Sequence, residues 1–335
     1  MATYKGIQGY SVKKLSSDPG TLSEVEGELW YNSTAGKFKI SAGGAGSWSS
    51  GSASNTARKA ALGAGILTAG LVTGGTAAPP TTGTEITATE TYNGSAWTET
   101  GHALNTGRRY GAGMGLQTAA LVAAGAGNTP GTAIAKTETY NGSTWTELAD
   151  VNTDRRDVQG SFGGTTTAGL IFGGYPPPQS ASAICESWDG TSWAEVGNLQ
   201  SATIQSVGAG TSTAALCSAG ANPGLTAKCE KWDGTSWAEV ADVNTARQGP
   251  AGSGVTNTAA LIFGGETPPV TAVTELWDGT SWTEVGDMAN TNYIATGVGT
   301  STAALNQGGH PLPARGTLTE EWDGAPVTAK TVTVS

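Results

Sequence analysis

The sequence contains no long apolar run. None of its 335 residues lie in a stretch of the roughly 20 apolar residues that a membrane-spanning helix requires. The N-terminal stretch MATYKGIQGY also lacks the apolar segment of a secretory signal. We therefore expect no membrane insertion and no export through such a signal.

Charged residues are scarce, and basic residues are the scarcer kind. Asp, Glu, Lys and Arg make up 13% of the sequence, and 17 Lys and Arg against 27 Asp and Glu give a net charge of −10. Binding to phosphate backbones depends on clustered Lys and Arg, so we expect no nucleic-acid partner. Few charges together with 51 glycines are typical of turn-rich β-structure rather than of a helical protein.

Histidine and cysteine are rarer still. The two histidines, His102 and His310, are far apart in the sequence, and no pair of residues has the spacing of a metal site. We expect neither a metal nor another cofactor. Cys185, Cys217 and Cys229 fit small buried hydrophobic residues, because a large repeat protein needs no disulfide.

The sequence is rich in one repeated phrase. WDGTSW occurs three times, and looser copies bring the total to six, at 92–97, 140–145, 188–193, 232–237, 277–282 and 322–327. The copies begin 44 to 48 residues apart, a period typical of four-stranded propeller blades. The Asn-Gly or Asp-Gly within each copy predicts a tight hairpin turn in which both central residues have positive φ.

The fifth repeat shows how one period fills with strands. Its apolar and alternating segments predict four antiparallel strands, at 250–255, 259–263, 273–277 and 281–285. An apolar strand ending in Gly-Gly, followed by a strand with Glu and an aromatic residue and then by Trp, resembles the kelch repeat. The resemblance implies an all-β fold, a six-bladed kelch-like β-propeller with a small N-terminal β-hairpin segment.

Both ends of the repeat array predict how the ring closes. Trp48 begins a fourth strand with no first three strands before it, whereas the last repeat lacks its Trp. We expect residues 46–324 to form the propeller, closed by the Trp48 strand. Residues 325–335 form a C-terminal strand or tail. The structural tryptophans of the repeat are Trp48, Trp97, Trp145, Trp193, Trp237 and Trp282.

Residues 1–45 do not follow the repeat. EGELWYNSTAGKFKI at 26–40 predicts a small hairpin, and a Gly/Ser linker joins it to the propeller. The string KLSSDPGTLSEVEGELWYNSTAGKFKI is similar to short segments of structural proteins of tailed bacteriophages, especially marine phages and cyanophages. The resemblance implies a tail or fibre protein, made in the host cytoplasm and present in several copies per virion. Residues 1–45 would then dock onto other virion proteins.

The variable loops predict where the propeller binds. In antiparallel blades, the connections between second and third strands share one face with the links between blades. These connections are rich in Pro, Asn and Thr, and they span 76–84, 126–133, 175–182, 221–225, 266–270 and 310–316. Variable loops on a rigid scaffold commonly carry binding sites. We expect this face to recognise a host-surface glycan or receptor, with Tyr110, Tyr175, His310 and Arg315 as candidate contacts.

One glutamate recurs in each repeat: Glu90, Glu138, Glu186, Glu230, Glu275 and Glu320. Groups repeated by pseudo-symmetry are better explained as structural acceptors of hydrogen bonds than as the two unlike carboxyl groups of a glycosidase. We therefore expect no catalytic residue and no enzyme. Two alternatives remain open: a purely architectural virion module that contacts neighbouring virion proteins, and a carbohydrate-active propeller enzyme.

Overall fold

The computed structural model describes residues 12–17, 29–42, 46–77, 85–127, 132–178, 180–324 and 328–332. The chain divides into two compact units, Ser47–Asp323 and a smaller one formed by Met1–Gly46 with Gly324–Ser335. Several predicted features lie outside the described residues: most of the phage-like segment before Leu29, part of the Gly/Ser linker, and parts of the loops at 76–84, 126–133 and 175–182.

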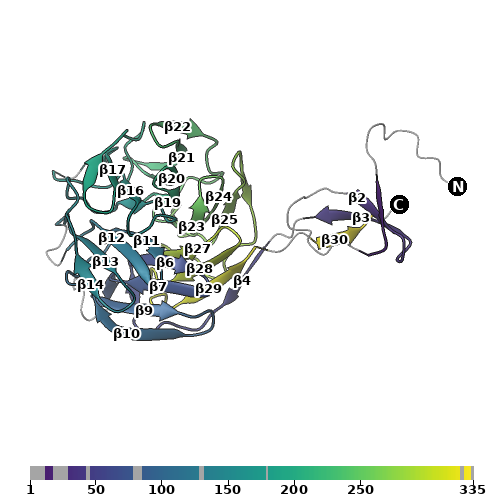
Figure 1. The fold of residues 1–335 in the computed structure, drawn as a ribbon, viewed down its shortest axis with the longest axis horizontal. Helices are drawn as coiled ribbons and strands as arrows, with labels where there is room; N and C mark the ends of the chain where they lie inside the picture. Colours follow the sequence, from purple (N-terminus) through teal and green to yellow (C-terminus); the bar gives the residue numbers. More distant parts are fainter. Residues whose placement is uncertain are drawn as a thin grey trace. The chain divides into compact units, whose positions relative to one another are not determined.

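Ser47–Asp323 forms six four-stranded antiparallel sheets arranged around a central axis (Figure 1). Blade 1 is β6 (Leu62–Ile66), β7 (Ala69–Thr73), β9 (Ala88–Tyr92) and β10 (Trp97–Ala103), and blade 2 is β11 (Ala112–Leu116), β12 (Ala119–Ala123), β13 (Thr137–Tyr140) and β14 (Trp145–Glu147). Blade 3 is β15 (Gln159–Gly160), β16 (Gly169–Phe172), β17 (Cys185–Trp188) and β18 (Trp193–Glu195), and blade 4 is β19 (Val207–Thr211), β20 (Ala214–Ala221), β21 (Leu225–Trp232) and β22 (Trp237–Val240). Blade 5 is β23 (Ala251–Thr256), β24 (Ala259–Phe263), β25 (Thr274–Trp277) and β26 (Trp282–Glu284).

Blade 6 is built from both ends of the propeller. Its strands are β27 (Thr296–Gly299), β28 (Ala303–Gln307), β29 (Thr319–Asp323) and β4 (Ser47–Ser50). β4 pairs antiparallel with β29, and Trp48 stands opposite Trp322. The orphan strand of the sequence therefore supplies the outer strand that the last repeat lacks, and the first strands of neighbouring blades contact one another all the way round.

The hairpin turns differ from the predicted ones. In the WDGTSW hairpin of blade 3, Trp188 pairs with Trp193, so the loop between them holds four residues. Gly190 has a positive φ of 98°, but Asp189 is not among the residues with positive φ. Instead, Asp189 Oδ1 accepts hydrogen bonds from the backbone nitrogens of Thr191 and Ser192, both at 2.8 Å. The prediction of positive φ at both positions was wrong, because the carboxylate closes the turn through its side chain.

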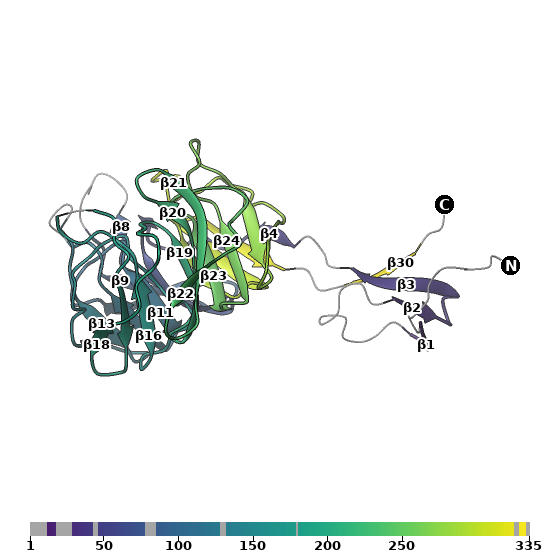
Figure 2. The same ribbon diagram turned by 90° about the horizontal axis from the view of Figure 1, so that it is seen from above.

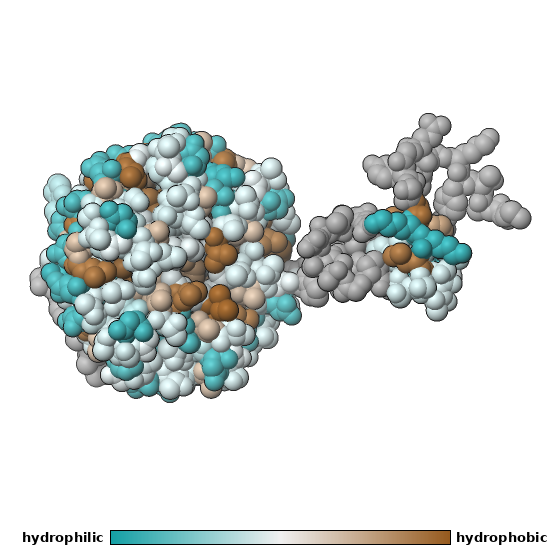
Figure 3. Space-filling view, in the orientation of Figure 1, coloured by the Kyte–Doolittle hydropathy of each residue, from teal (hydrophilic) through white to brown (hydrophobic). Residues whose placement is uncertain are grey.

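Aromatic side chains fill the space between blades. The first aromatics of the repeats are almost fully buried, and the second-position tryptophans Trp97, Trp145, Trp193, Trp237 and Trp282 are buried as well. Four indole nitrogens donate to a threonine hydroxyl of the preceding blade at 2.9–3.0 Å: Trp48 to Thr274, Trp97 to Thr319, Trp145 to Thr89 and Trp193 to Thr137. Because the large apolar side chains lie inside, hydrophobic residues form only small separate patches on the face seen in Figure 3.

Cysteines stand in place of the threonine in the other two blades, and the indole nitrogens of Trp237 and Trp282 have no hydrogen-bond partner. Cys185 and Cys229 occupy the positions of the threonines that precede the repeat glutamate, and both are buried and free. Burial raises the pKa of the Cys185 thiol to about 12 and that of Cys229 to about 11. Both thiols therefore stay protonated at neutral pH and act as packing groups.

The repeat glutamates are structural acceptors, as expected for groups that recur with the pseudo-symmetry. Glu90 accepts hydrogen bonds from the backbone nitrogens of Asn55 and Thr56 and pairs with Arg58 at 2.7 Å. Burial opposes ionisation of Glu90, but these hydrogen bonds and Arg58 lower its pKa overall. Buried pairs of the same kind occur in three further blades: Arg108–Glu138, Arg155–Glu186 and Arg247–Glu275.

The smaller unit contains one sheet. Its strands are β1 (Lys13–Leu15), β2 (Leu29–Asn32), β3 (Lys37–Ala42) and β30 (Thr328–Thr331), in that spatial order. β2 and β3 form the predicted hairpin, and Trp30 is fully buried. β30 pairs with β3 rather than with a propeller blade, as Figure 2 also shows. The hairpin, too small to be stable alone, thus gains a strand on each side.

Candidate functional site

Six residues at equivalent positions surround the propeller axis. Each stands two residues after the position of the repeat arginine and has φ between 49° and 57°: Ala60, Tyr110, Asp157, Gln205, Gly249 and Ile294. We call this set the axial ring. Five of its members carry a side chain in a left-handed conformation that L-residues seldom adopt. Such strain persists only where the surroundings impose it, and it is often found at functional sites.

Backbone hydrogen bonds impose this conformation. The nitrogen of Ala60 donates to the Ile294 carbonyl at 2.9 Å, and the nitrogen of Tyr110 donates to the Ala60 carbonyl at 3.0 Å. Four further bonds from a backbone nitrogen to a backbone carbonyl complete the ring, at 2.8–3.4 Å: Val158 to Tyr110, Gln205 to Asp157, Gly249 to Gln205 and Ile294 to Gly249. Each bond links one blade to the next, so the ring fixes the backbone while its side chains vary freely.

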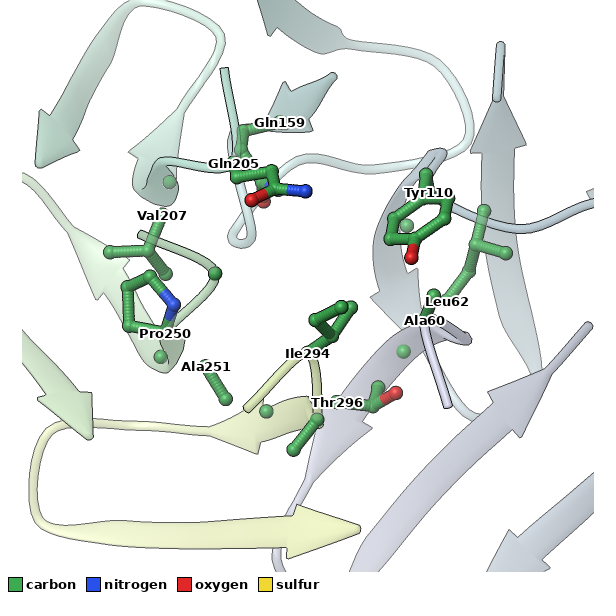
Figure 4. A pocket seen from close by; sticks show the side chains of 18 of the residues that line it. Ala60, Leu62, Tyr110, Gln159, Gln205, Val207, Pro250, Ala251, Ile294 and Thr296 are labelled. Carbon is green, nitrogen blue, oxygen red and sulfur yellow. The ribbon is translucent and has the colours of Figure 1, made fainter. Parts of the chain in front are cut away.

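The axial ring surrounds a small cavity (Figure 4). Its volume is about 90 Å³, and side chains from several blades line it, among them Tyr110, Gln159, Gln205 and Ile294. A cavity of roughly 150 Å³ holds benzene, so this one is too small to enclose a sugar ring. A ligand of sugar size would therefore contact the rim of the cavity rather than enter it.

Polar side chains link several blades at this rim. Asp157 accepts hydrogen bonds from Arg156 at 2.6 Å and from Gln205 Nε2 at 3.2 Å. Gln205 Oε1 in turn accepts a bond from the Tyr293 hydroxyl at 3.3 Å. Burial raises the pKa of Asp157, although Arg156 and Gln205 favour its ionised form. The rim thus combines donors, acceptors and aromatic faces in one connected group.

Three of the four candidate residues belong to this region. Tyr110 is a member of the axial ring and lines the cavity. The guanidinium of Arg156 lies 4.9 Å from the centre of the Tyr175 ring. His310 packs edge-to-face on Tyr293, with ring centres 6.3 Å apart. Arg315 is separate from the cavity lining, and its guanidinium donates to Asn290 Oδ1 at 2.6 Å.

The axial ring and the variable loops lie on one face. Backbone bridges connect the link before each blade to the start of the loop between its second and third strands: β5 (Arg58–Lys59) with β8 (Thr76–Ala77), Arg109 with Ala126, Arg156 with Tyr175, Ile204 with Ala221, Gln248 with Glu266 and Tyr293 with His310. The ring side chains and the loops therefore form one continuous surface, which we call the axial face.

Asp157, Gln205, Gln159, Arg156 and Tyr293 were not predicted from the sequence. A signal for the ring positions was present, however. When the repeats are aligned on Arg58, Arg108, Arg155 and Arg247, the residue two positions later changes from Ala to Tyr, Asp and Gly. Variation this close to a constant arginine is typical of a side chain that faces solvent or a ligand rather than the core.

Comparisons with known proteins agree with this architecture. No known family model matches the chain, and no curated protein matches its sequence. Among solved structures, YjhT is similar, with a TM-score of 0.65 and 14% sequence identity over 86% of this chain and 98% of YjhT. YjhT is a kelch propeller. The chain is thus an all-β, six-bladed kelch-like β-propeller, and identity this low shows the fold alone.

Two kinds of feature, metal-binding clusters and membrane-spanning helices, are absent from the described residues. No group of three or more His, Cys, Asp or Glu side chains in this part of the chain is arranged to hold a metal ion. Nor does any helix in this part have the length and apolar character needed to cross a membrane.

Proposed function

We propose that this protein is a non-enzymatic tail or fibre protein of a tailed bacteriophage and that its axial face binds a glycan of the host surface. The observation that carries the proposal is the axial ring. It holds Tyr110, Asp157 and Gln205 in a fixed left-handed backbone beside the variable loops. Tyrosine offers an apolar face and a hydroxyl, and Asp and Gln offer the planar acceptors and donors that sugar hydroxyls need.

The small cavity favours binding over catalysis on a buried substrate. A volume of about 90 Å³ leaves a sugar at the rim, in contact with water. The repeat glutamates are occupied by backbone nitrogens and, in four blades, by arginine. Asp157 is held by Arg156 and Gln205. These carboxylates already have structural partners, which supports a role in recognition.

The smaller unit supports an anchoring role for the chain ends. The segment that resembles phage structural proteins contributes β2 and β3, and the C-terminal β30 joins the same sheet. This unit and the propeller are two separate compact units of the chain. We propose that it docks onto other virion proteins, in several copies per particle, and leaves the axial face to contact the host.

Two experiments test the proposal. Mass spectrometry of purified phage particles should find peptides of this chain, and their absence from particles would contradict the virion role. The full-length protein should bind specific bacterial surface glycans on an array, and the glycans should be recovered unchanged after incubation. Release of cleaved sugars would favour the enzyme alternative instead.

A further inference from the structure

The buried arginine of the repeat is missing from blade 4. In blade 1, Arg58 donates to the carbonyls of Gly74 and Ala88, both at 3.0 Å, and pairs with Glu90 at 2.7 Å. Alignment of the two repeats places Thr203 where blade 1 has Arg58. The counterparts of the three acceptor residues are Ala219, Lys228 and Glu230.

A cavity occupies the place of the missing side chain. Its volume is about 230 Å³, and Thr203, Ala219, Lys228 and Glu230 are all among the residues that line it. Exposed Asn222 and Lys228 lie at its mouth, whereas Ala219 and Glu230 are buried. An apolar cavity of roughly 150 Å³ is large enough to hold benzene, so this one has room for a guanidinium group and part of its alkyl chain.

Two polar groups in the cavity lack a partner: Glu230 lacks the cation that the repeat arginine would supply, and the hydroxyl of Thr203, which stands at the arginine's position, has no hydrogen bond. Glu230 is only 4% exposed and accepts hydrogen bonds from the backbone nitrogens of Gln200 and Ser201, yet the described residues contain no ion pair to it. Thr203 is 5% exposed, and its Oγ1 has no hydrogen-bond partner. A buried carboxylate without a cation and a buried hydroxyl without a partner are both costly, and a bound cation with several N–H donors would satisfy them.

Lys228 does not take the arginine's place. Its Nζ pairs with Glu239 at 3.2 Å. In blade 2, Lys136 stands at the equivalent position and pairs with Glu147, although Arg108 and Glu138 form an intact buried pair beside it. A lysine at this position is therefore compatible with a guanidinium next to the glutamate.

Blade 6 also lacks the arginine and replaces only one of its bonds, because Glu320 has no ion pair in the described residues and its Oε2 has no hydrogen-bond partner. Asn292 stands at that position and donates from Nδ2 to the Gly308 carbonyl at 2.7 Å, as Arg58 does to Gly74. Thr203 makes no such bond in blade 4.

We infer that the blade 4 cavity is a binding site for an alkylguanidinium group, the chemistry of an arginine side chain. The guanidinium would pair with the Glu230 carboxylate and donate hydrogen bonds to the backbone carbonyls of Ala219 and Lys228. Thr203 Oγ1 would accept a further bond. A planar group with five N–H donors matches this arrangement better than a single ammonium. The site borders the axial face, because Asn222 of the loop at 221–225 lines it, but the inference does not depend on glycan binding.

Calorimetric titration of the full-length protein with methylguanidinium chloride tests the inference. We expect saturable binding of one equivalent and a rise in melting temperature with ligand concentration, because a ligand that binds the native state stabilises it. Methylammonium chloride at the same ionic strength should bind more weakly, since it cannot reach several acceptors at once. Equal effects of the two salts, or no saturable binding, would overturn the inference.

Two matched variants locate the site. Thr203→Arg restores the repeat and should fill the cavity, raising the melting temperature and weakening methylguanidinium binding at least about tenfold, through lost space and charge repulsion. Thr213→Arg adds the same charge at an exposed turn position and should leave binding unchanged. Undiminished binding to the Thr203→Arg variant would also overturn the inference.

A comparison of two probes separates the sources of the guanidinium. Nα-acetyl-arginine amide carries the group as it occurs in a protein segment. Binding at least as tight as that of methylguanidinium would identify an arginine of a protein partner as the ligand. Binding of methylguanidinium alone would identify a small free guanidinium compound, with the same site chemistry.

Discussion

The indole nitrogen of Trp48 lies 3.0 Å from Thr274 Oγ1, although 226 residues separate the two in the chain. Trp48 belongs to β4, the outer strand of blade 6, and Thr274 belongs to β25 of blade 5. The Trp48 ring also contacts Phe263 and Trp322, with ring centres 4.7 Å and 5.5 Å away. The first strand of the propeller thus joins its last two blades.

The contribution of this contact can be measured by a double-mutant cycle. Trp48→Ala should lower the free energy of unfolding by about 3 kcal/mol, as for other truncated large aromatics in a core. Thr274→Val should cost about 1 kcal/mol, because it removes one hydrogen bond. In the Trp48→Phe background, Thr274→Val should cost almost nothing. An equal cost in both backgrounds, measured by denaturant unfolding, would show that the indole bond contributes nothing.

The buried Arg58–Glu90 pair should be far more important than a surface pair. Arg58→Leu leaves the buried Glu90 carboxylate without its cation and should cost about 3–5 kcal/mol. Lys228→Met is the control, because Lys228 and Glu239 are both about half exposed and water screens their charges. Chemical denaturation of both variants checks the prediction. A similar small loss for both would contradict the structural role of the repeat arginine.

Much of the fold follows from local sequence signals. The period of the WDGTSW phrase and the lone Trp48 predict six blades and an orphan strand, because each blade repeats one set of turns and apolar strands. The pairing of β30 with β3 could not be predicted, since residues 328–331 carry no signal for one edge strand over another. The candidate site was harder to predict than the fold. Asp157 and Gln205 are ordinary polar residues in sequence, and only the ring geometry brings them together.

The Asp-Gly turns should contribute to acid sensitivity. Hydrogen bonds from the turn backbone and hydroxyls lower the pKa of Asp189, Asp233 and Asp278 to about 2. The pKa of an unfolded aspartate is about 3.9, so these turns stabilise the fold above that pH and lose the contribution as the pH falls towards 2.

Blades 1 and 2 show that Asp→Asn is a suitable substitution for this test, because Asn93 and Asn141 accept the same hydrogen bonds from the turn and do not titrate in this pH range. A chain with Asn at all three aspartate positions should unfold like the native protein at pH 7 but lose less stability between pH 4 and pH 2. Thermal melts of both proteins between pH 4 and pH 2 check this difference in stability loss. Parallel loss in both proteins would contradict the assignment.

The two compact units should be separable. A chain shortened to residues 46–324 retains β4 and all six blades, so its propeller should melt cooperatively within a few degrees of the full-length protein. According to the proposed anchoring role, it should fail to join phage particles. Melting curves of the shortened chain check the first expectation. Mass spectrometry of particles from phage complemented with the shortened chain checks the second. Normal incorporation of the shortened chain would contradict anchoring by the smaller unit.

The most direct test of the account is a comparison of glycan affinity among axial-ring variants. Tyr110→Ala and Gln205→Ala each introduce the residue that blade 1 carries as Ala60 at the same φ, so the ring backbone should persist. Ser192→Ala, which copies Ala96 of blade 1 into a turn at the other ends of the strands, is the control. Titration with an array-identified glycan should show affinity reduced at least about tenfold by either axial change, the loss of roughly 1.4 kcal/mol of binding, and unchanged by Ser192→Ala. Native affinity in both axial variants, with their folds intact, would contradict glycan recognition by the axial face.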